Sequence, residues 1–323
     1  MVDGEGIPFM LVFVVTIVLG TTGNIIVLFA FISVAVKQKR FPPLDRVIVN
    51  KTFVNLLLCF YQGIPRMLTC YRVELMQETG CIILVYLSSS LRCISIWSVS
   101  NLSFLHLIKI KRPNWALVNY ILSHQSRYVN VSISALWLTT FTFYIPYTMD
   151  KIIRLSQDQQ NRSGGYLPST SCNGLASSSA SDIVTYISVS LDLIAIVWVV
   201  VLNVLIIQLL CKHQRRVGVA GQGLNPGSKI TLQATRILVS LLCIYVTCWI
   251  SNDIVWIMLI ANVMPDQGQN QTLKYTSSLI SSLYYTASSY VLVFGHRNVK
   301  DVFTAVCRRL KQRKAAHFQD VET

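Results

Sequence analysis

The stretch that decides the fold is residues 7–34, IPFMLVFVVTIVLGTTGNIIVLFAFISV, which contains no charged side chain. A helix needs about 20 predominantly apolar residues to cross about 30 Å of bilayer hydrocarbon, so this stretch is long enough to span a membrane. It is too long for the apolar part of a signal peptide, and the preceding residues, MVDGEG, are acidic where a signal peptide is basic. We therefore expect it to stay in the protein as the first transmembrane helix.

Further stretches of similar character follow along the chain. With the first, they predict an all-α membrane protein, a seven-transmembrane helix bundle. The predicted spans are Ile7–Val34, Val47–Met67, Cys81–Ile110, Val129–Tyr147, Ser181–Leu210, Ile237–Met264 and Tyr275–Phe294.

The charges indicate how the bundle is oriented. The 323 residues include 28 Lys and Arg but only 14 Asp and Glu, and the charged fraction of 13% is about half of that in a soluble domain. Most of the basic residues follow spans one, three, five and seven, which places the N-terminus outside and the tail inside. Residues 1–6 are then extracellular, 7–296 form the receptor-like bundle and 297–323 form a cytoplasmic tail. Contact with the inner face of the bilayer explains the positive charge, so we expect no nucleic-acid partner.

Cysteine and asparagine residues on the outer side predict two covalent features. Cys81 lies at the outer end of the third span, and Cys172 lies in the longest outer loop. The oxidising compartment outside the cell favours a disulfide between them. Two free thiols are the alternative. Asn161 and Asn270 each begin an Asn-x-Ser/Thr glycosylation acceptor on the same side.

Three of the charged residues in the predicted spans lie at a similar depth. Arg92, Asp192 and Asp253 each lie about 16 Å below the outer end of their helix, at about 1.5 Å per residue. A charge at this depth must face the bundle and find a partner. We expect the three to line a ligand cavity, with Arg92 available to an anionic group. The alternative is an internal salt bridge that only fixes helix packing, and the sequence leaves open which aspartate pairs with Arg92.

Aromatic and small polar side chains accompany these charges, a mixture typical of small-molecule sites. Each could equally serve helix packing. These candidate pocket residues are Tyr86, Ser89, Trp97, Trp249, Asn252 and Trp256. Asn24 and Asn55 are expected to form interhelical hydrogen bonds, and Lys51 to extend its amine to the inner membrane interface.

Seven helices, an external N-terminus and a bridge to the second outer loop resemble a G-protein-coupled receptor. The marks of its rhodopsin-like branch are absent, because the third span ends HLIKIK at residues 106–111 without an acidic-Arg-aromatic triplet. The seventh span also lacks Asn-Pro-x-x-Tyr.

The sequence instead resembles the vomeronasal type 1 receptors and their fish counterparts, the olfactory receptors related to class A. The resemblance rests on Gly80-Cys81, Tyr86, Arg92 and Leu102-Ser103 in the third span, Gly63-Ile64-Pro65 in the second, and the run ATRILVS at 234–240. Cys93 departs from it, standing where that family has Gly. Residues 102–115, LSFLHLIKIKRPNW, also resemble bitter-taste receptors, which are the alternative.

This resemblance implies a chemosensory receptor in the plasma membrane that detects a pheromone-like or olfactory cue and activates a heterotrimeric G protein. We expect a charged small-molecule ligand, with an anion slightly favoured. The basic inner rim expected to contact the G protein comprises Lys109, Lys111, Arg112, Arg215, Arg216 and Lys229.

Val299–Leu310 has an apolar face at helical spacing, which predicts a short amphipathic helix on the membrane, with Cys307 either acylated or free.

Neither a phosphate-binding loop nor paired metal ligands occur, so we expect no enzyme, cofactor or metal. A proton-coupled transporter is the rival from another class, although the sequence shows no internal repeat.

Overall fold

The computed structural model describes part of the chain. The described residues are 6–70, 78–111, 115–146, 148–149, 152–153, 179–219, 240, 242–255, 257–258, 267–295, 299–300, 302, 304 and 308. Apart from short connections such as residues 39–42, these residues are helical, and none of them forms a strand. This agrees with the predicted all-α class.

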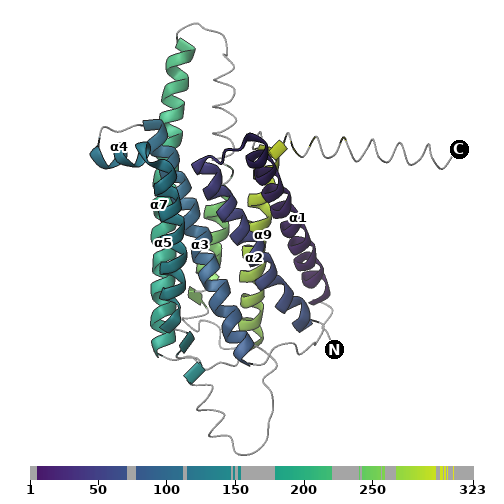
Figure 1. Ribbon diagram of the computed structural model, residues 1–323. Coiled ribbons are helices and arrows are strands. Elements are labelled where there is room, and N and C mark those ends of the chain that lie inside the picture. Colours follow the sequence, from purple (N-terminus) through teal and green to yellow (C-terminus); the bar gives the residue numbers. More distant parts are fainter. Residues whose placement is uncertain are drawn as a thin grey trace, which may run out of the picture.

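The long helices run side by side as a bundle, and the short helix α4 lies across one end of it (Figure 1). They are α1 (Gly6–Gln38), α2 (Pro43–Cys70), α3 (Glu78–Lys111), α4 (Ala116–Ser123), α5 (Gln125–Phe143), α7 (Ser179–Val219) and α9 (Gln267–Gly295). Between α7 and α9 the chain is also helical at residues 242–255, called here the 242–255 helix.

Three of these helices carry segments long and apolar enough to cross a membrane. The segments are Leu11–Gln38 in α1, Ile82–Lys111 in α3 and Tyr186–Leu209 in α7, and Leu242–Val255 is a shorter apolar helix. Exposed apolar side chains cover the outside of α1 and α7, among them Val18 at 56% exposure and Val197 at 63%. Such a surface is stable against lipid and unstable against water. The chain is a helical membrane protein.

The structure extends the sequence prediction at two places. The predicted fifth span ends at Leu210, but α7 continues to Val219 and projects beyond the bundle (Figure 1). Helix α4 is not predicted from apolar length, because it has only 8 residues. Val118 and Ile121 of α4 are buried in a small core with residues of α2, α3 and α5, so packing stabilises this short helix.

The third helix lies near the middle of the bundle and packs against α2 and α7, while α1 packs against α2 and α9. Close contact between α1 and α9 depends on glycine. A Cβ atom added at Gly20 would lie 2.6 Å from Thr286 Oγ1 of α9. Small residues allow helix backbones to approach in this way where no water drives association.

Polar side chains join the helices within the apolar core. Asn24 Nδ2 donates to the Tyr285 carbonyl at 3.4 Å, and Asn55 Nδ2 donates to Ser288 Oγ at 3.1 Å. Ser95 Oγ of α3 in turn donates to Asn55 Oδ1 at 2.8 Å. The expected interhelical roles of both asparagines are therefore confirmed.

The expectation for Lys51 is wrong. Its side chain does not reach the membrane interface, because the residue is only 5% exposed and its Nζ lies 5.3 Å from the centre of the Tyr284 ring of α9. Lys51 faces the interior because α2 presents this side to α9. A cation over an aromatic face gains electrostatic attraction.

The segment after α9 is described at a few positions only. Residues 299–300, 302, 304 and 308 are helical, as predicted. Val299 is fully buried in a core shared with α1, α2 and α9, so the first turn packs on the bundle. Phe303, Val306, Cys307 and Leu310 lie outside the described residues.

Candidate functional site

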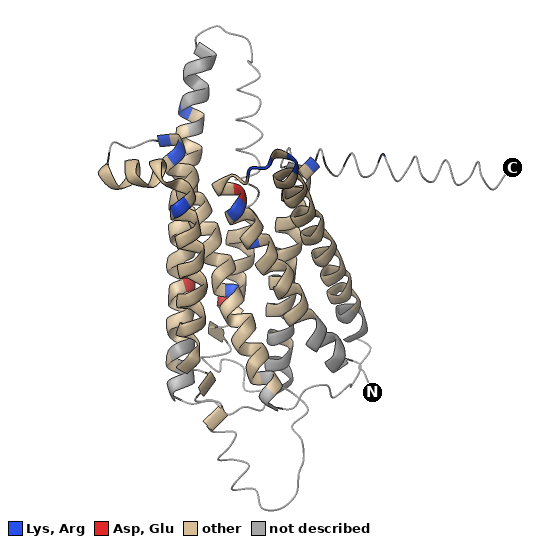
Figure 2. Cartoon of the chain, viewed as in Figure 1, with Lys and Arg blue, Asp and Glu red and all other residues tan. Residues whose placement is uncertain are grey.

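Three helices bring their buried charges together at one point. Arg92 of α3 donates through Nη2 to Asp192 Oδ2 of α7 at 2.8 Å and to Asp253 Oδ1 of the 242–255 helix at 2.6 Å. We call these three residues the charge cluster. Their contact confirms that they share one depth, and it answers the open pairing question, because both aspartates bind the same guanidinium nitrogen. Figure 2 shows acidic and basic positions in the middle of the bundle, among helices that are mostly uncharged.

The charge cluster is almost closed to solvent. The side-chain exposures are 4% for Asp192 and 1% for Asp253, while Arg92 keeps 15%. Removing charges from water is costly, and a pair repays that cost only when its geometry is good and its remaining atoms are bonded. Arg92 therefore keeps the largest exposure of the three side chains.

Two neighbours on the 242–255 helix complete the surroundings of Arg92. Trp249 is buried, and the Arg92 Cζ atom lies 5.0 Å from the centre of its ring, which is a cation–π arrangement. The Asn252 amide fits best when its oxygen accepts from Arg92 Nη1 and Nη2, each at 3.2 Å. Its nitrogen then donates to Ser277 Oγ and Ser281 Oγ of α9, so four helices meet at this site.

Ser277 and Ser281 were not among the residues selected from the sequence. Both are buried, at 5% and 6% exposure. The signal was present, because serines recur four residues apart in α9, at 277 and 281 and at 278 and 282, and so fall on one helical face.

The charge cluster also contains polar atoms without partners. Within the described residues, buried Asp253 Oδ2 accepts no hydrogen bond and buried Arg92 Nε has no acceptor. Buried polar atoms are almost always bonded in native proteins, so each such atom needs an explanation.

The other candidate pocket residues are distributed differently. Tyr86 points to α5, where its hydroxyl donates to the Phe141 carbonyl at 2.9 Å. Trp97 packs against the central core, and Ser89 is partly buried. Trp256 lies outside the described residues. The structure thus gathers Trp249 and Asn252 at the charge cluster, whereas Tyr86 serves contact between α3 and α5.

The predicted positions on the two faces of the membrane are described only in part. Cys172, Asn161, Arg112 and Lys229 lie outside the described residues, as do the side chains of Cys81, Asn270, Arg215 and Arg216. Asn270 belongs to the first turn of α9. Lys109 and Lys111 are described, and both are exposed at the end of α3.

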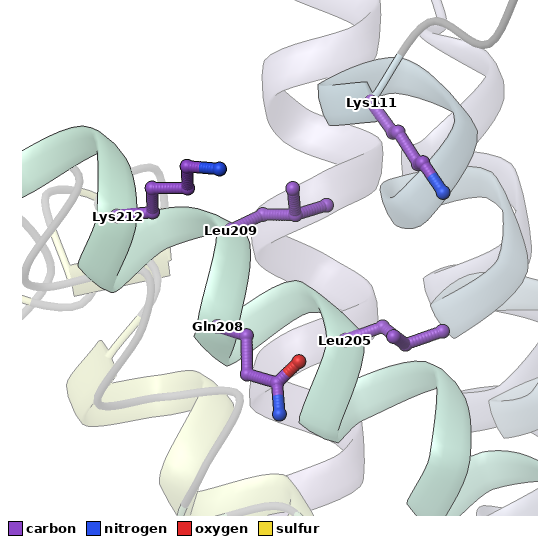
Figure 3. Close-up of a pocket in the computed structure, with 5 residues that line it drawn as sticks. All are labelled: Lys111, Leu205, Gln208, Leu209 and Lys212. Atoms are coloured by element: carbon purple, nitrogen blue, oxygen red, sulfur yellow. The ribbon is translucent and has the colours of Figure 1, made fainter.

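The end of α3 at Lys111 and the neighbouring part of α7 border a second candidate site, a small pocket. Its volume is about 220 Å³, and the side chains that line it are Lys111, Leu205, Gln208, Leu209 and Lys212. Figure 3 shows Lys111 on one helix and the other four on its neighbour. Two cations therefore border an apolar floor.

Comparisons with known proteins agree with this architecture. The pattern that defines the vomeronasal organ pheromone receptor family matches residues 9–305. The chain is also similar to a zebrafish (Danio rerio) protein, olfactory receptor class A-like protein 1, with 22% identity over 306 residues, covering 92% of each chain. The match spans the bundle and includes the charge cluster. The chain belongs to the vomeronasal organ pheromone receptor family.

Proposed function

We propose that this chain is a seven-transmembrane chemosensory receptor of the plasma membrane, with its N-terminus outside and its tail inside. It binds a small external molecule at the charge cluster and activates a heterotrimeric G protein. Membership of a pheromone receptor family and similarity to a protein named as an olfactory receptor support the chemosensory role.

The observation that carries the ligand site is the meeting of charges from separate helices. Arg92 holds α7 and the 242–255 helix through one nitrogen, and Asn252 extends the contact to α9. A ligand that changes one bond here changes the relative stability of several helix positions at once. A ligand shifts a conformational equilibrium only by binding its states differently, and this cluster offers such a difference.

The inner pocket supports the coupling role. Lys111 and Lys212 lie on α3 and α7, the helices that the charge cluster joins deeper in the bundle. A shift between these helices would change the spacing of the two cations. Their positive charge fits an acidic surface on a partner.

The outer features of the proposal remain those expected from the sequence. A disulfide between Cys81 and Cys172 would hold the outer loop over the mouth of the bundle, and Asn161 and Asn270 would carry glycans. Cys307 would be available for acylation on the inner side.

The experiment is a calcium assay in cells that express the chain together with a promiscuous G protein. The cells are exposed to small aromatic and aliphatic compounds, with surface expression measured on the same cells. We expect concentration-dependent responses that require both the receptor and the G protein. Responses of equal size without the G protein, or transport of the compound into the cells, would contradict the proposal.

The coupling site has its own test. Substituting Lys111→Glu together with Lys212→Glu should reduce G-protein activation about tenfold or more, because the pocket would repel an acidic partner. Lys37→Glu, an exposed lysine at the end of α1, is the matched control and should leave activation unchanged. Equal effects of both variants would remove the pocket from the coupling surface.

A further inference from the structure

The charge cluster has an unequal balance of charge. One guanidinium faces two carboxylates, so the ionised cluster has a net charge of −1. Asn252, Ser277 and Ser281, which complete the site, are neutral. Within the described residues, no other cation lies within 4.0 Å of either carboxylate. A lone negative charge in a membrane interior is unstable, so one more positive charge would balance this site.

The geometry identifies where that charge would bind. Both carboxylates meet at Arg92 Nη2, so they are near neighbours that repel each other. Asp253 is 1% exposed, and its Oδ2 atom has no hydrogen-bond partner among the described residues. A buried carboxylate oxygen without a donor is a ready acceptor for an N–H group.

We propose that the ligand carries an ammonium group, which donates to Asp253 Oδ2 and completes the charge balance of the cluster. This inference rests on the proposed ligand site and gives it a chemical class. The charge proposed for the ligand is opposite to the one expected from the sequence. The sequence indicates that Arg92 is available to an anion, but it does not show that both aspartates bind Arg92.

An anionic ligand fits the site less well. It would raise the net charge of the cluster to −2, or it would have to displace an aspartate from Arg92 Nη2 and leave that carboxylate buried without a cation. Arg92 Nε does lack an acceptor among the described residues. A neutral oxygen from water or from the ligand can accept that hydrogen bond without adding negative charge.

The test measures binding without signalling, so it can fail while the receptor role stands. Purified full-length receptor is melted in the presence of methylammonium, benzylammonium or 2-phenylethylammonium. The comparison compounds are acetate, benzoate and phenylacetate. We expect at least one ammonium to raise the melting temperature by about 3 °C at saturation, because a ligand that binds only the folded state stabilises it. The carboxylates should raise it by less than about 1 °C on the same reasoning.

Two variants make the result specific. Asp253→Asn, which leaves Arg92 paired with Asp192 in a neutral cluster, should abolish the shift. Asp45→Asn, at the inner end of α2, is the matched control and should retain it. A larger shift with a carboxylate, no shift with any ammonium, or a full shift in Asp253→Asn would each overturn the proposal. Each variant is compared with its own ligand-free melting curve, so a change in basal stability does not obscure the result.

Discussion

At the residue scale, the unequal balance of the charge cluster predicts unequal effects of substitution. Arg92→Gln leaves two buried carboxylates without a cation and should destabilise the receptor by about 3–5 kcal/mol. Asp253→Asn leaves one ion pair intact, so it should lower the free energy of unfolding by clearly less. Surface expression and the melting temperature of purified protein measure both variants. Equal losses would show that the two carboxylates do not share one arginine.

The charge cluster is also the part of the site that sequence reasoning located best. Arg92, Asp192 and Asp253 were selected by counting residues along separate helices, and the structure joins them through one nitrogen. The count succeeded because helices have a constant rise and because membrane charges must find partners. It could not show that both aspartates share the arginine, since that depends on how the helices rotate against each other.

Lys51 provides a second test of buried charge. Its ammonium lies over the Tyr284 ring, and among the described charged groups none contributes an opposing charge. The attraction to the ring amounts to about 0.5–2 kcal/mol, less than the several kcal/mol that burial of an unpaired charge costs. Lys51→Met should therefore raise the melting temperature. A marked decrease would indicate that Lys51 has an anionic partner.

At the scale of the helix, hydrophobic length correctly predicted three helices of membrane-spanning length. The apolar stretches of α1, α3 and α7 were recognised because a run of about 20 apolar residues is typical of a membrane-spanning helix. Sequence alone missed α4, which is too short for a span, and the continuation of α7 to Val219. Helix α4 and the end of α7 both lie beyond the apolar stretches, where local helix propensity and packing determine whether the chain is helical.

The contact between α1 and α9 can be tested at Gly20. Gly20→Val places carbon against Thr286 Oγ1, which itself donates to the Thr16 carbonyl at 2.9 Å. We expect the free energy of unfolding to fall by about 1–3 kcal/mol, which is typical of overpacking, and the melting temperature to fall with it. The control is Ile25→Val, at a position that is 49% exposed on the same helix, and it should change little. A neutral Gly20→Val would mean that the helices are further apart.

At the scale of the whole molecule, orientation follows from the distribution of charge. Basic positions gather at the end of the bundle near α4, and few appear elsewhere (Figure 2). The positive-inside rule predicts that this end faces the cytoplasm. The fold class and the predicted orientation follow from the composition and the distribution of charge, whereas the ligand class depends on the few atoms that the folded bundle leaves unpaired.

Antibody access tests this orientation. A tag before residue 1 should be stained on intact cells, and a tag after residue 323 only after permeabilisation. Asn161→Gln and Asn270→Gln should each remove one glycan, seen as a loss of mass on a gel. Staining in the reverse pattern would contradict both the orientation and the outer glycans.

The most direct test of the central claim, that the external ligand binds at the charge cluster, is a concentration–response curve. An agonist found in the calcium assay is applied to the wild-type receptor, to Asp253→Asn and to Asp45→Asn at equal surface density. We predict that Asp253→Asn raises the half-maximal concentration about 100-fold, since loss of one partner from a buried charge pair costs about 2–5 kcal/mol of binding. Asp45→Asn should leave the curve unchanged. An unchanged curve for Asp253→Asn would contradict the account and place the ligand elsewhere in the bundle.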